Sequence, residues 1–143
     1  MSKRVSLVDK KKVRERARGY CEYCMSQEYY ASQAFTIDHI IPLILGGLNE
    51  LLNLCLCCQG CNNFKYTKIK SIDPKTQKMV QLFNPRTNSW KDHFKWNENH
   101  TVIIGITKTG RSTVEALKLN RTYLLNQRVL YIAHGIHPPS HTV

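Results

Sequence analysis

The chain has 143 residues, of which 42% are hydrophobic, and this length fits one globular domain with a modest core while excluding two independent ones. Lysine and arginine outnumber aspartate and glutamate by 21 to 10. The resulting formal charge of +11 favours a polyanionic partner, nucleic acid before a membrane surface. No apolar run approaches the roughly 20 residues that span a bilayer, which excludes a membrane-spanning chain.

The N-terminal segment is basic and carries no apolar stretch of the kind found in secretory signals, so we expect a cytoplasmic protein. Residues 9–18 combine helix-forming side chains with Asp9 as a candidate N-cap and Gly19 as a terminator, which predicts a short basic helix. Its cations either form a solvated face or contact phosphate groups. They are Lys10, Lys11, Lys12, Arg14, Arg16 and Arg18, of which Lys11, Lys12, Arg14 and Arg18 are our candidates for nucleic-acid contact.

Two cysteine pairs, Cys21-x-x-Cys24 and Cys58-x-x-Cys61, have the spacing of zinc ligands. A gap of two residues lets both thiolates of a tight turn reach one tetrahedral ion, so the pairs predict a structural zinc site. The six cysteines of the chain also allow three disulfides in a secreted domain. The spacing and the missing signal favour reduced, metal-bound thiolates instead.

The remaining cysteines, Cys55 and Cys57, lie close to the second pair, and Cys57 adjoins Cys58 as a competing ligand. We prefer Cys58 because it alone has the gap of two residues to Cys61. Cys55 and Cys57 fall on one face of a short strand and are expected to be small buried hydrophobic residues.

Between the cysteine pairs, residues 35–41 (FTIDHII) are apolar and β-branched around Asp38 and His39, which predicts a strand. Pro42 ends that strand and Gly46-Gly47 marks a turn. Residues 53–57 (NLCLC) predict a second, short strand that completes a hairpin.

A helix is expected to follow this hairpin, beginning near Asn62. Lys65 comes three residues later, so both side chains project from one side of the helix. Beyond it, residues 71–76 (SIDPKT) predict a turn.

The C-terminal half predicts a hairpin and two helices. Residues 94–107 (FKWNENHTVIIGIT) indicate two strands around a polar turn. Ser112-x-x-Glu115 is a candidate capping box for a helix through Leu119. Asn120 is a candidate cap for a second helix that Gly135 closes, with an apolar face formed by Leu124, Leu125, Val129 and Ile132.

Three further expectations concern single residues of this half. Trp90, Phe94 and Trp96 are expected to pack in the core rather than stack on unpaired bases. The tail from Pro138 is expected to be loosely ordered. We treat the remaining histidines as structural or surface residues, since they lack ligand spacing; these are His93, His100, His134, His137 and His141.

Two segments carry a family resemblance: DHIIPLILGG, residues 38–47, and NLCLCCQGCNNFK, residues 53–65. With the cysteine frame, residues 21–65 resemble the HNH endonucleases, in the HNN branch, because Asn62 stands where many members have histidine. The resemblance implies an α+β fold: one domain of residues 1–143 with a ββα-metal core at about 9–70, clamped by the four-cysteine zinc site. An accessory hairpin and helices at about 80–135 complete it.

The resemblance also implies the roles of single residues. His39 is expected to act as the general base, since an imidazole is partly unprotonated at neutral pH; outside this motif a lone histidine at a strand end is ordinarily structural. Asp38 and Asn62 are expected to hold Mg²⁺ or Mn²⁺, Asn53 to tie the hairpin loop together, and Lys65 to contact nucleic acid.

The expected activity is hydrolysis of DNA phosphodiester bonds that leaves 5′-phosphate and 3′-hydroxyl ends. One alternative is a zinc-containing module that binds nucleic acid without cutting it, against which the intact Asp38, His39 and Asn62 argue. The other is an RNA-directed nuclease, since positive charge recognises the phosphate backbone and not the sugar.

Overall fold

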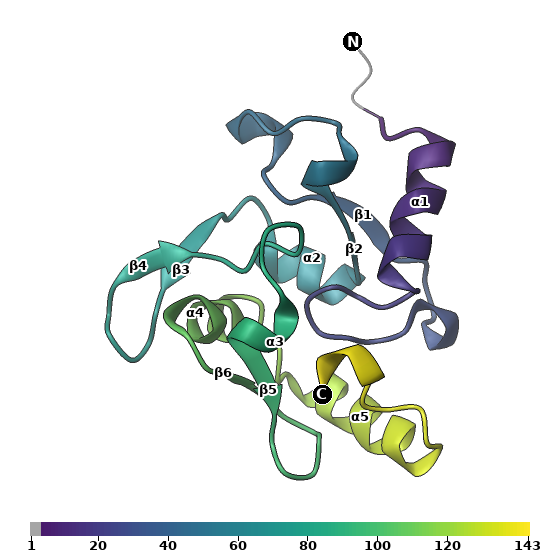
Figure 1. The fold of residues 1–143 in the computed structure, drawn as a ribbon, viewed down its shortest axis with the longest axis vertical. Coiled ribbons are helices and arrows are strands. Elements are labelled where there is room, and N and C mark those ends of the chain that lie inside the picture. The colour runs from purple at the N-terminus through teal and green to yellow at the C-terminus, as the bar shows by residue number, and fades with distance from the viewer. Residues whose placement is uncertain (1–3) are drawn as a thin grey trace.

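The computed structural model describes residues 4–143, which form five α-helices and three two-stranded antiparallel sheets (Figure 1). Each sheet is a hairpin of neighbouring strands, and the helices pack around them. This arrangement confirms the predicted α+β class. None of the helices in these residues is long and apolar enough to cross a membrane.

Helix α1 spans Leu7–Ala17. It begins earlier than predicted, because the hydroxyl of Ser6, and not Asp9, is the cap: it accepts a hydrogen bond of 3.1 Å from the Asp9 amide. Val13 and Ala17, one turn apart, are buried and fix the side of the helix that faces the core.

The predicted ββα unit follows. Strand β1, Thr36–His39, pairs antiparallel with β2, Leu54–Cys57, so that Asp38 lies opposite Cys55 and His39 opposite Leu54. Helix α1 packs against β2. Helix α2, Gln59–Lys65, begins before the predicted Asn62, because Cys58 is its N-cap.

A second hairpin, β3 (Lys70–Ile72) with β4 (Met79–Gln81), was predicted only as a turn. Asp73 organises that turn, accepting hydrogen bonds from the Lys75 and Thr76 amides and from Arg111. The strands themselves are largely exposed, so they lack the apolar alternation that predicts a strand.

The third hairpin confirms its prediction. Helix α3, Trp90–His93, leads into β5, Phe94–Trp96, which pairs with β6, Ile103–Gly105. Helix α4, Lys108–Ala116, packs against β6 at Gly110, where an added Cβ would lie 2.0 Å from the His93 carbonyl oxygen. The aromatic residues of this unit are buried as expected: Trp90, Phe94 and Trp96.

Both predicted caps of the C-terminal helices are wrong. Thr107 caps α4 by accepting from the Gly110 amide, whereas Ser112 is buried inside the helix. Helix α5, Thr122–Ala133, has Arg121 at its N-cap. The Asn120 side chain instead pairs with the backbone of Ile103, accepting from its amide and donating to its carbonyl.

The predicted apolar face of α5 is also wrong except for Leu124. Its buried residues are Leu124, Arg128 and Tyr131, while Val129 is 57% exposed. Arg128 can be buried because its guanidinium donates hydrogen bonds to the Thr101 and Leu119 carbonyls. A hydrophobicity pattern does not reveal such bonds, so the buried arginine was not predicted.

The C-terminal tail is held in place, contrary to expectation. Thr142 is buried and accepts a hydrogen bond of 2.9 Å from the Trp96 indole. The buried residues of the described chain form one continuous cluster that includes Cys21, Leu56, Phe94 and Leu124, so the N- and C-terminal halves share a core.

Candidate active site and zinc centre

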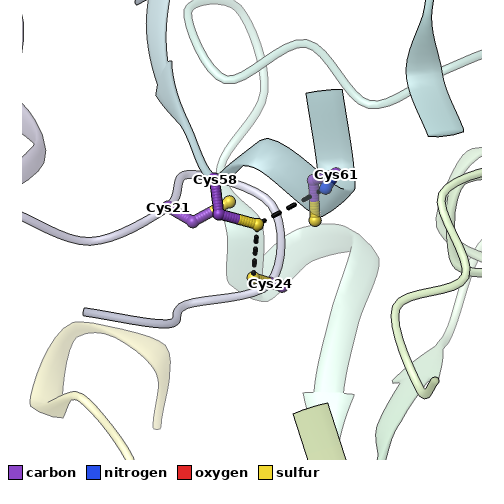
Figure 2. A group of neighbouring side chains, drawn as sticks. All are labelled: Cys21, Cys24, Cys58 and Cys61. Carbon is purple, nitrogen blue, oxygen red and sulfur yellow. Dashed lines mark hydrogen bonds between the residues drawn. The ribbon is translucent and has the colours of Figure 1, made fainter. Parts of the chain in front are cut away.

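The four cysteines of the two pairs come together between the loop after α1 and the start of α2 (Figure 2). All four are buried, and their sulfur atoms lie within 4.8 Å of one another. Zinc–sulfur bonds of about 2.3 Å in a tetrahedron require sulfurs about 3.8 Å apart. The Cys24 and Cys58 sulfurs lie 3.7 Å apart, so the cysteine cluster fits a tetrahedral zinc ion. Cys55 and Cys57 are buried outside this cluster, as predicted.

Neighbouring groups favour the thiolate form of Cys58 alone, since burial raises the pKa of Cys21 and Cys24 and the hydrogen bonds with the other cysteines raise that of Cys61. Hydrogen bonds with Cys21, Cys24 and Cys61 hold the pKa of Cys58 far below its ordinary value despite burial. Arg121 donates to the sulfurs of Cys58 and Cys61 at 3.5 and 3.6 Å. Burial acts to lower the pKa of Arg121, but the Cys61 sulfur prevails and raises it.

Gly60 makes the approach of Arg121 possible, since an added Cβ at this position would lie 2.5 Å from the Arg121 guanidinium. Arg121 precedes α5, so this contact fastens the accessory half to the zinc-ligand cluster. Sequence analysis could not indicate this partner, because Arg121 lies 63 positions from Cys58.

The second cluster lies where α2 crosses the end of β1. The Lys65 ammonium lies 3.2 Å from Asp38 Oδ2 and donates to the His39 and Ile40 carbonyl oxygens. The Lys65 side chain is 2% exposed and therefore faces the strand. Its predicted contact with nucleic acid is not supported: its charge is directed at Asp38, not at the surface.

Asp38 already has a cationic partner. Its side chain is 13% exposed, and the Lys65 ammonium lies 3.2 Å from its Oδ2 atom. Burial raises the pKa of Asp38 above its ordinary value, against the opposing effect of Lys65. Asn62 lies three residues before Lys65, so its side chain projects from the same side of α2.

Asn53 occupies the role expected of it as a loop residue. Its Oδ1 accepts a hydrogen bond of 2.8 Å from the Ile41 amide, and its Nδ2 donates to the Ile41 and Leu48 carbonyls. These three bonds close the segment between β1 and β2 just beyond His39. Gly47 permits the closure, since an added Cβ there would overlap the Ile41 carbonyl.

His39 has a partner that sequence reasoning missed. Its Nε2 lies 2.7 Å from Asn49 Oδ1, and Asn49 Nδ2 donates to the Arg4 carbonyl at 3.0 Å. The bond to Arg4 fixes which end of the amide faces the ring, so Nε2 must donate to Oδ1. In the neutral ring Nδ1 then carries the lone pair. The only sequence signal was a second asparagine in the loop that Asn53 closes.

The basic residues of α1 are placed differently from one another. Arg14 pairs with Glu28 at 3.0 Å and donates to the Phe35 carbonyl, so it serves the fold. Arg16 donates to the Leu51 and Leu54 carbonyls. Lys11, Lys12 and Arg18 are exposed, and Lys11 pairs loosely with Glu15.

The five other histidines are absent from the one group of potential metal ligands in residues 4–143. Two of them have structural partners: His93 bonds the Thr107 hydroxyl and His137 the His100 carbonyl.

Comparison with known proteins agrees with this geometry. Residues 21–79 match the family model described as HNH endonuclease, a stretch that begins at the first zinc-site cysteine and ends in β4. Neither the curated proteins nor the solved structures contain a match to the chain. Residues 21–79 are therefore similar in sequence to the HNH endonuclease family, and this stretch holds the four clustered cysteines and the ββα unit.

Proposed function

We propose that this protein is a metal-dependent endonuclease that hydrolyses DNA phosphodiester bonds. The observation that carries the proposal is the geometry at the end of β1, where Asn49 orients the His39 imidazole and Lys65 holds the adjacent Asp38 carboxylate by an ion pair of 3.2 Å. Families of this type act on nucleic acid with a divalent metal, and the net charge of +11 suits such a substrate.

The residues divide the chemistry between them. His39 Nδ1 is the base that accepts a proton from the attacking water, and Asn49 holds the ring by its other nitrogen. Asp38 and Asn62 are the proposed ligands of Mg²⁺ or Mn²⁺, which when bound stabilises negative charge on the phosphate. Lys65 fixes the Asp38 side chain and the backbone of the strand end.

Cleavage of a supercoiled plasmid by the zinc-loaded protein, with and without added Mg²⁺, tests the proposal. Nicked or linear product that requires Mg²⁺ is the expected result. Unchanged plasmid together with retained DNA binding would favour a binding module without catalysis. Competition between duplex DNA and RNA of equal length tests the substrate, since preferential cutting of RNA would contradict the assignment to DNA.

Loss of a residue that only hydrogen-bonds a metal ligand lowers activity by roughly 10–100-fold. Asn62→Ala, which removes a proposed ligand itself, is expected to lower Mg²⁺-dependent cleavage by at least this factor. Asn62→His should retain some activity with the preference shifted from Mg²⁺ toward Ni²⁺ or Mn²⁺, because imidazole suits softer metals than amide oxygen does. The measurement is plasmid cleavage by both variants across a metal panel. Wild-type activity of Asn62→Ala in Mg²⁺ would show that Asn62 is not a ligand.

Asn49→Ala is expected to lower the maximal cleavage rate about fivefold at unchanged DNA affinity, since it removes one hydrogen bond, worth about 1 kcal/mol, that orients the base. Asn49→Asp keeps the accepting oxygen and should retain more activity than Asn49→Ala. The measurement is kcat and KM for all three proteins. A change in KM alone, or equal losses in both variants, would show that Asn49 does not position His39.

A further inference from the structure

A basic groove lies between α1 and β1, beside the proposed active site. Its volume is about 620 Å³, and its walls include Arg4 and Lys10 from the N-terminal side and Thr36 and His39 from the strand. His39 is therefore both the proposed base and part of the groove wall. A molecule bound in this groove reaches the reacting atoms directly.

The groove carries positive charge. Its lining contains the cations Arg4, Lys10 and Arg14 and no carboxylate. The charge of Arg14 is balanced by Glu28, which lies behind the wall. Lys10 is half-buried, and its ammonium group has no hydrogen-bond or ion-pair partner among residues 4–143. A cation held at the edge of a groove in this way suits an anionic ligand.

Helix geometry separates Lys10 from the other lysines of α1. Successive residues of a helix are about 100° apart, so Lys12 projects about 200° from Lys10. Lys10 and Arg14, one turn apart, share the side that faces β1, and Lys12 is exposed on the opposite side. The sequence made Lys12 a candidate for nucleic-acid contact, but Lys12 does not line the groove, so the contact inferred below uses Lys10 and not Lys12.

Resting on the proposed function, we infer that this groove binds the phosphate backbone of the DNA strand next to the scissile phosphate, with Lys10 contacting one phosphate. Phosphate is the anion that a nuclease substrate presents regularly along its length. His39 lines the groove, so a strand lying in it places a phosphodiester beside the base. The contact is to the backbone and is independent of the bases.

The test compares Lys10→Gln with the matched variant Lys12→Gln, which removes the same charge from the same helix on the other side. Binding of a short DNA duplex to zinc-loaded protein is measured by fluorescence anisotropy over a salt series, without added Mg²⁺ so that the DNA stays intact. Lys10→Gln is expected to weaken binding roughly tenfold at low salt and to reduce the slope of log affinity against log salt by about 0.9. Lys12→Gln is expected to bind with the wild-type slope.

Two further readouts separate this inference from its alternatives. In cleavage assays Lys10→Gln should raise KM and leave kcat unchanged, because the contact is the same in the ground and transition states. Its loss of affinity should be equal for two unrelated DNA sequences, since a loss confined to one would indicate a base contact and overturn the inference.

If the wild-type protein binds and cuts DNA but Lys10→Gln and Lys12→Gln weaken binding equally, the inference about the groove is overturned and the proposed function stands. A wild-type protein that neither binds nor cuts DNA would overturn both. Equal melting temperatures of the three proteins exclude misfolding as the cause of any difference.

Discussion

Replacing His39 with alanine is expected to remove nearly all DNA cleavage, because loss of a general base ordinarily lowers a rate by about 10²–10⁴-fold. The fold should be unaffected. The histidine is only partly buried, and its side chain is hydrogen-bonded to Asn49 in the loop between β1 and β2. DNA binding should also remain, since Lys10 and the net charge are unchanged.

The measurement is single-turnover cleavage of a supercoiled plasmid in Mg²⁺, with His134→Ala as the control. His134 is exposed at the end of α5, so its variant is expected to cut at the wild-type rate. Added imidazole should restore part of the His39→Ala activity if the missing group is a base. Undiminished cutting by His39→Ala would refute the role assigned to this residue.

The ββα unit and the zinc-ligand cluster could be predicted because their signals are local. A gap of two residues brings Cys58 and Cys61 together whatever the rest of the chain does. The apolar and β-branched residues around Asp38 likewise predict a strand from the local sequence. The exposed β3–β4 hairpin has no such signal, and it was missed.

Partners of charged residues could not be predicted, because the fold brings together groups that are distant in the chain. Arg14 and Lys65 read as cations available for phosphate, yet Arg14 binds Glu28, 14 positions away, and Lys65 binds Asp38. Asn49 was missed for the same reason, since its role depends on where the Arg4 carbonyl lies. The sequence therefore predicts which residue types form the site, and the tertiary contacts decide which of their atoms remain available.

Cys58→Ser is expected to release zinc and to destabilise the whole protein. Structural zinc contributes apparent binding free energies of about 10–16 kcal/mol in small zinc domains, and loss of only about 4 kcal/mol lowers Tm by on the order of 10–20 °C in a domain of this size. Here the effect should be global, because Cys58 also caps α2 and accepts from Arg121, which fastens α5 to the cluster.

Cys57→Ser provides the matched control, since Cys57 adjoins Cys58, is equally inaccessible to solvent and lies outside the ligand cluster. It buries one hydroxyl in place of a thiol, which costs about 1–3 kcal/mol if the hydroxyl stays unpaired, but it leaves all four ligands in place. Native mass spectrometry should therefore find one zinc in Cys57→Ser and none in Cys58→Ser, and thermal unfolding should show the larger fall in Tm for Cys58→Ser. The reverse pattern would assign the fourth ligand to Cys57 and require the end of β2 to rearrange, because Cys57 now lies outside the group of four sulfur atoms.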